Sequence, residues 1–172
     1  MEAQQGTLLI KNQISALLRQ LPPDVYTCPI ALFHGSTVGQ HFRHILEFYT
    51  CLLEGCDKAY INYGSRARND SIAENQEIAI SVLESVISAV VRLDVRQVLQ
   101  IESEFSDSST SKPTYLSSLG RELQYAFDHA VHHLAIIRMG LEAHFPEISV
   151  DPDLGVAPST LRHRKECTTA EI

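Results

Sequence analysis

Residues 127–137, FDHAVHHLAII, place three histidines within five positions of an otherwise apolar stretch. Apolar residues recur here every three or four positions, which predicts a long amphipathic helix with a buried stripe of Leu119, Leu123, Ala126, Ala130, Ile137 and Leu141. His129 and His133 lie one turn apart at the edge of this stripe, whereas His132 is turned further from the core. Two imidazoles at this spacing can bind one metal ion.

A second helical segment, TVGQHFRHILEFY at residues 37–49, carries His41 and His44. A helical wheel slightly favours His41 as the histidine nearer the buried stripe. A single histidine beside an apolar stripe is more often a hydrogen-bonded structural residue than a ligand. However, five of the eight histidines of the chain fall in these two segments. Two histidine-bearing helices in one helical chain favour a metal site in the core of a bundle.

The rest of the chain predicts an all-α fold, a four-helix bundle with long connections. Helices are expected over about residues 4–20, from Ser36 or Thr37 to Gly55, from residues 69–71 to about Leu93, and from Ser117 or Ser118 to about Phe145. Strands within VRQVLQIESEF (residues 95–105) and near residues 114–116, with a turn at 106–113, predict a small β-hairpin before the last long helix. We therefore divide the chain into a bundle, residues 1–145, and an irregular C-terminal arm, residues 146–172.

Composition excludes several classes of function. The net charge is −7 and there is no basic stripe, which argues against binding to nucleic acid. No apolar run approaches the roughly 20 residues that span a bilayer, and the N-terminus does not resemble a signal peptide. The four cysteines form no CxxC pair, so reduced thiols in a cytoplasmic protein are expected.

The segments TVGQHFRHI (residues 37–45) and HAVHH (residues 129–133) resemble the two signature segments of the DinB-like family of metal-binding four-helix bundles, which includes the YfiT-type proteins. The resemblance covers about residues 4–145 and ends after Pro146. It implies that His44, His129 and His133 are the metal ligands, and so it replaces the choice of His41 made by the helical wheel. His41 and His132 remain as alternative or neighbouring ligands. The resemblance also fits the predicted hairpin.

Three neutral imidazoles would leave a coordination position open, as in catalytic metal sites. Ligation by nitrogen alone suits a divalent zinc or nickel ion and does not choose between them. The resemblance implies a thiol-dependent S-transferase that acts on a small-molecule substrate with a low-molecular-weight thiol. A metal-dependent hydrolase and a non-catalytic bundle that binds metal or a partner are the alternatives. No catalytic acid or base is assigned, because Asp128 points away on the wheel.

The segment YGSRAR, residues 63–68, supplies candidate substrate contacts. Tyr63 and Arg66 follow the second predicted helix, and an arginine can bind a substrate carboxylate in a bidentate manner. The more common arrangement is a solvated loop in which the arginines pair with Asp57 or Asp70. The sequence leaves the oligomeric state open, a homodimer included.

Overall fold

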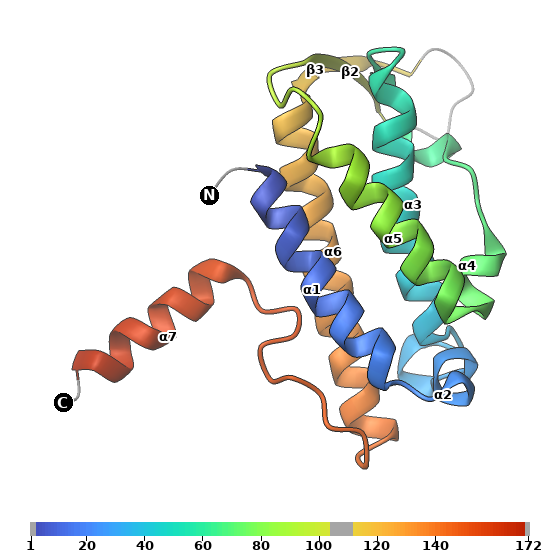
Figure 1. Cartoon of the computed structure of the whole chain (residues 1–172), viewed down its shortest axis with the longest axis vertical. Coiled ribbons are helices and arrows are strands. Elements are labelled where there is room, and N and C mark those ends of the chain that lie inside the picture. The colour runs from blue at the N-terminus through green and yellow to red at the C-terminus, as the bar shows by residue number, and fades with distance from the viewer. Residues whose placement is uncertain (1–2, 104–111, 171–172) are drawn as a thin grey trace.

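The computed structural model describes residues 3–103 and 112–170, and its main body is a bundle of four long helices (Figure 1). In this bundle α1 packs against α5 and α6, and α3 packs against the same two helices. A continuous apolar core fills the space between them. The predicted class of a helical bundle is therefore confirmed. The four helices are α1 (Ala3–Gln20), α3 (Val38–Cys56), α5 (Gln76–Val90) and α6 (Leu119–His144).

Side-chain caps fix where the two histidine-bearing helices begin. The Thr37 hydroxyl accepts a hydrogen bond from the backbone N–H of Gln40, and the Gln40 side chain accepts one from the backbone N–H of Thr37. This capping box starts α3 one residue after Thr37. Ser118 caps α6 in the simpler way, by accepting from the N–H of Arg121. Both starting points agree with the predicted ones.

The connections contain more structure than the sequence predicted. The loop after α1 forms α2 (Pro23–Thr27) and a 3₁₀ turn, η1 (Ala31–Phe33). The predicted single helix from residues 69–71 to Leu93 is wrong: α4 (Asp70–Glu74) and α5 are separate helices. The chain is extended at Asn75, whose side chain accepts from the N–H groups of Glu77 and Ile78 and so caps α5.

The hairpin is confirmed as β2 (Val98–Glu102) paired antiparallel with β3 (Thr114–Ser118). Most of the predicted turn, 106–111, lies outside the described residues. The segment expected to be a polar connector adds a third strand, β1 (Tyr60–Ile61), parallel to β2. A further 3₁₀ turn, η2 (Tyr63–Ser65), follows directly. The small sheet therefore fixes the backbone from which Tyr63 and Arg66 project.

The predicted irregular arm, residues 146–172, is irregular only in its first half. The side chain of Leu154 is buried against the core. Gly155 has φ +70°, and a Cβ there would lie 2.1 Å from the backbone nitrogen of Ala135, so only glycine fits this close approach. The chain then forms α7 (Pro158–Ala170), which projects away from the bundle (Figure 1). Within the described ranges, no helix is long and apolar enough to cross a membrane.

Candidate metal centre

Helices α3 and α6 bring three histidines together in the middle of the bundle. His44 comes from α3, and His129 and His133 come from successive turns of α6. Their ring centroids are 4.6–4.9 Å apart, and one nitrogen of each ring lies within 4.8 Å of the other two. This group could therefore hold a metal ion, and it consists of the three residues that the family resemblance implied, with His44 in place of the His41 that the helical wheel favoured.

One ring nitrogen of His129 lacks a hydrogen-bond partner in the described part of the chain. Its Nε2 atom is buried and has no hydrogen-bond partner among the described residues. Buried polar atoms are rarely left without a partner, so a ligand at Nε2 would remove an energetic cost. The ring of Phe48 stacks against the His129 imidazole, with centroids 4.1 Å apart and an angle of 15° between the planes. This contact fixes the plane of the imidazole. The donor atoms present thus fit a divalent ion.

The two alternative ligands lie in different environments. His41 Nδ1 is 2.9 Å from His133 Nδ1, so one of the two nitrogens donates a hydrogen bond to the other. If His133 is the donor, its Nε2 carries a free lone pair, and His41 orients it as a hydrogen-bond acceptor. His132 is exposed to solvent and outside the group of three. The structure thus places His41 beside the group.

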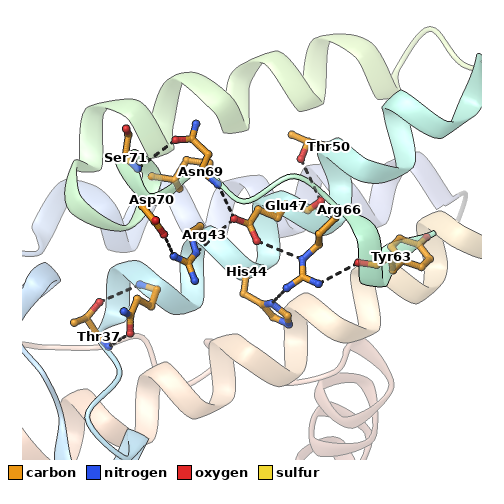
Figure 2. A network of polar contacts seen from close by, with 12 residues as sticks. Thr37, Arg43, His44, Glu47, Thr50, Tyr63, Arg66, Asn69, Asp70 and Ser71 are labelled. Atoms are coloured by element: carbon orange, nitrogen blue, oxygen red, sulfur yellow. Dashed lines mark hydrogen bonds and ion pairs between the residues drawn. The ribbon is translucent and has the colours of Figure 1, made fainter. Parts of the chain in front are cut away.

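A buried carboxylate that the sequence analysis did not single out lies behind His44. Only 2% of the Glu47 side chain is exposed. Its Oε1 atom accepts from the backbone N–H of Asn69 at 3.0 Å and is 3.4 Å from Arg43 Nε, and Figure 2 shows Glu47 between these residues and Arg66. Its Oε2 atom accepts from Arg66 Nε at 3.3 Å. Because both oxygens are occupied, we exclude Glu47 as a free base at the histidine group.

Arg66 connects this carboxylate with the histidines. Its Nη1 donates to the carbonyl oxygen of Tyr63 at 3.1 Å, and its Nη2 donates to Nδ1 of His44 at 3.0 Å (Figure 2). The expected pairing of Arg66 with Asp57 or Asp70 is wrong, because its carboxylate partner is Glu47. Asp70 pairs instead with Arg43. The ion pair between Arg66 and Glu47 therefore holds the loop that follows β1 against α3.

Tyr63, the other candidate contact, is buried. Its hydroxyl donates to Oε2 of Glu122 at 2.9 Å. Its ring stacks on Phe48, with centroids 5.0 Å apart, and Phe48 in turn stacks on His129. Tyr63 thus belongs to an aromatic stack that ends at the histidine group, and its hydroxyl is not free to bind a substrate.

The environment keeps these imidazoles neutral. Burial, followed by the charge of neighbouring histidines, lowers the pKa of His133 to about 3. Burial, followed by the charges of His129 and Arg66, lowers the pKa of His44 to about 4. Burial also lowers the pKa values of His41 and His129. Neutral rings carry the lone pairs that a metal ion requires.

These shifts predict how the stability of chelator-treated protein depends on pH. The pKa is about 6.5 in the unfolded chain and lower in the folded one, so the unfolded state binds more protons between these values. Stability should be full above about pH 7 and should fall as the pH drops through 6.5 toward 4. Thermal melts at several pH values measure this slope. His133→Asn should flatten this slope. A His133→Asn variant that keeps the slope of the parent protein would contradict the assignment of the pH dependence to the buried histidines.

A cavity of about 440 Å³ opens onto the histidine group. Its volume is sufficient for a small molecule. Its lining is polar and contains no carboxylate among the described residues: it consists of Ser36, Gln40, His41, Arg43, His44 and His133. The site can therefore combine metal binding with access for a small polar or anionic molecule.

Comparison with known proteins gives one partial similarity. No protein-family model matches the chain, and no solved structure matches it. The chain is similar to the FK506-binding protein 5 of Rhizopus delemar, with 36% identity over 117 residues. The matched region covers 62% of this chain and 28% of that protein. The chain thus corresponds to little more than a quarter of the relative's length.

Proposed function

We propose that the protein is a divalent-metal-binding protein of the DinB-like family, with His44, His129 and His133 as ligands. The observation that carries this proposal is the convergence of three neutral imidazoles from two helices, one of them with a buried Nε2 that lacks a partner. Ligation by nitrogen alone suits zinc or nickel. The four cysteines form no disulfide, which is in keeping with the reducing cytoplasm as its compartment.

The activity that we propose is a thiol-dependent S-transfer to a small-molecule substrate. A bound divalent ion would supply a Lewis acid that makes a nearby thiol more acidic at neutral pH. Ser36 and Gln40 line the cavity and offer hydrogen bonds to the reactants, and Arg43 adds a positive charge. The buried core around α6 limits access of water from behind the histidines.

Hydrolysis is the second candidate, and His41 is the observation that favours it. It lines the cavity beside His133 and, with its Nδ1 accepting from His133, offers its Nε2–H to orient a water molecule in the cavity. The two buried carboxylates nearby are less suitable for this role, because hydrogen bonds to other residues occupy both oxygens of Glu47 and of Glu122.

A cobalt-substituted protein tests the transferase. Addition of a small thiol is expected to produce a sulfur-to-cobalt charge-transfer band in the near-ultraviolet, and His133→Ala should abolish both the band and cobalt retention. The protein's own thiols are a weak source of such a band. Burial raises the pKa of Cys51 to about 11 and also raises that of Cys56. Cys51→Ser is the control and should leave the band unchanged. A protein that holds one cobalt ion and shows no band with any thiol would favour hydrolysis.

A further inference from the structure

A second cavity, of about 530 Å³, lies next to the histidine group. Arg66 lines this cavity and also lies within hydrogen-bond distance of His44. Its walls include the aromatic rings of Phe48, Tyr63, Tyr115 and Tyr125. The rings of Phe48 and Tyr63 are stacked, and the Tyr125 ring meets Tyr63 edge-on at 5.6 Å. Such walls favour a flat apolar group, which gains from stacking as well as from burial. The cavity also contains the guanidinium groups of Arg66 and Arg121 and the carboxylates of Glu102 and Glu122.

The carboxylates of this cavity are already hydrogen-bonded within the protein. Glu122 accepts from the hydroxyl of Tyr63 at 2.9 Å and from that of Ser117 at 2.6 Å. Glu102 accepts from the side-chain amide of Asn62 at 2.6 Å and from the hydroxyl of Tyr60. Each oxygen thus has a donor, so a cationic ligand would have to displace or share these bonds.

The two arginines of the cavity, in contrast, keep unused donors. Arg66 donates three hydrogen bonds, to Glu47, Tyr63 and His44, and a guanidinium carries five N–H groups. The guanidinium carbon of Arg121 lies 5.9 Å from the ring centre of Tyr125. Among the residues that the structure describes, Arg121 has no carboxylate partner. The arginines therefore offer N–H donors to a ligand beside the aromatic rings, whereas the carboxylate oxygens of the cavity are already hydrogen-bonded.

The contact between Arg66 and His44 links this cavity to the metal site. A guanidinium can only donate, so Nδ1 of His44 accepts and the neutral ring carries its proton on Nε2. A ligand imidazole needs one nitrogen free for the ion and an N–H on the other. His44 therefore cannot bind an ion and accept from Arg66 at the same time. Metal binding must release this N–H of Arg66 for another acceptor.

We propose that the second cavity binds a small carboxylate with a flat apolar body, held by Arg66 and Arg121, and that this ligand and the divalent ion bind cooperatively. A carboxylate matches the planar donors of a guanidinium, and its charge reduces the repulsion between Arg66 and an ion at His44. The cooperativity rests on the proposed metal site, whereas the carboxylate site itself does not. Because coupling is reciprocal, each ligand raises the affinity for the other by the same factor.

The probes are 3-phenylpropanoate and its neutral amide, titrated by NMR into the full-length protein with chelator and after loading with zinc. In both forms the carboxylate should bind about tenfold more tightly than the amide, because a charged hydrogen-bonded pair is lost in the amide. Arg121→Gln should remove this preference. The control is Arg19→Gln, at an exposed site on α1, which should keep it. Zinc should tighten carboxylate binding by about fivefold, within the usual range of coupling between two sites.

The outcomes separate this proposal from the metal function. Equal binding of the carboxylate and the amide, or no saturable binding of either, overturns the carboxylate site. Binding that disappears with chelator and does not respond to Arg121→Gln places the carboxylate on the ion and also overturns it. Binding that depends on Arg121 but not on zinc, in protein shown by elemental analysis to hold zinc, overturns the cooperativity. If the protein retains no zinc yet binds the carboxylate through Arg121, the carboxylate site is supported and the proposed metal function is wrong.

Discussion

His133→Ala is expected to abolish stoichiometric retention of a divalent ion, and His132→Ala is expected to leave it intact. The two residues are adjacent on α6, but His133 faces His44 and His129, whereas His132 is exposed. Loss of an outer partner of a ligand typically costs about 10–100-fold in metal affinity, so loss of a ligand should cost more than about a hundredfold. Elemental analysis of protein purified without a metal-affinity tag, and competition with a coloured chelator, measure the two effects.

The same experiment decides the role of His41. If His41→Ala loses the ion and His44→Ala retains it, then His41 is a ligand and the choice made by the helical wheel was right. If His133→Ala and His44→Ala both retain the ion, the histidine group is not the metal site. Circular dichroism of each variant checks that helix content is unchanged, because His41 and His133 are only half-buried and their removal leaves the apolar core intact.

The features that the sequence predicted well are local ones. The spacing of His129 and His133 depends only on the geometry of one helix, and the caps at Thr37 and Ser118 depend on side chains within a few residues. The break at Asn75 depends on local sequence too, but it was not predicted. An asparagine followed two positions later by Glu77 is a usual start of a helix, but the apolar pattern continues across it. It does so because α4 and α5 both pack against α3.

The features that the sequence did not predict depend on tertiary packing. His41 and His44 are three residues apart, and the buried side of α3 is broad because it contacts α4, α5 and α6. On a helical wheel, the average direction of the apolar residues of α3 therefore does not show clearly which of the two histidines faces the core. Glu47 and Arg66 are separated by 19 positions, and an acidic residue in a helix is ordinarily exposed. The one signal in the sequence was the position of Glu47 beside the apolar residues Leu46 and Phe48.

Glu47→Gln is expected to destabilise the folded protein by about 3 kcal/mol, because removal of one partner from a buried ionic network leaves the other charges uncompensated. We expect the lower end of the usual range of about 3–5 kcal/mol, since the side chains of Arg43 and Arg66 are 22% and 14% exposed and water can partly solvate them. The matched control is Glu54→Gln, at an exposed site on the same helix, which should change stability by less than about 0.5 kcal/mol. Urea unfolding with chelator present measures this difference without a contribution from metal.

The same substitution should also weaken metal binding, because Arg66 lies within hydrogen-bond distance of His44 and Glu47 is its carboxylate partner. Without that carboxylate, the positive charge beside His44 opposes a divalent ion more strongly. Raising the salt concentration should reduce the effect, since mobile ions screen the charge of partly exposed groups. Metal titrations of Glu47→Gln and Glu54→Gln at low and high salt provide the test. A Glu47→Gln protein that unfolds at the same urea concentration as the parent, and binds metal as tightly, would show that the carboxylate supports neither the α3 loop contact nor the charge balance at His44.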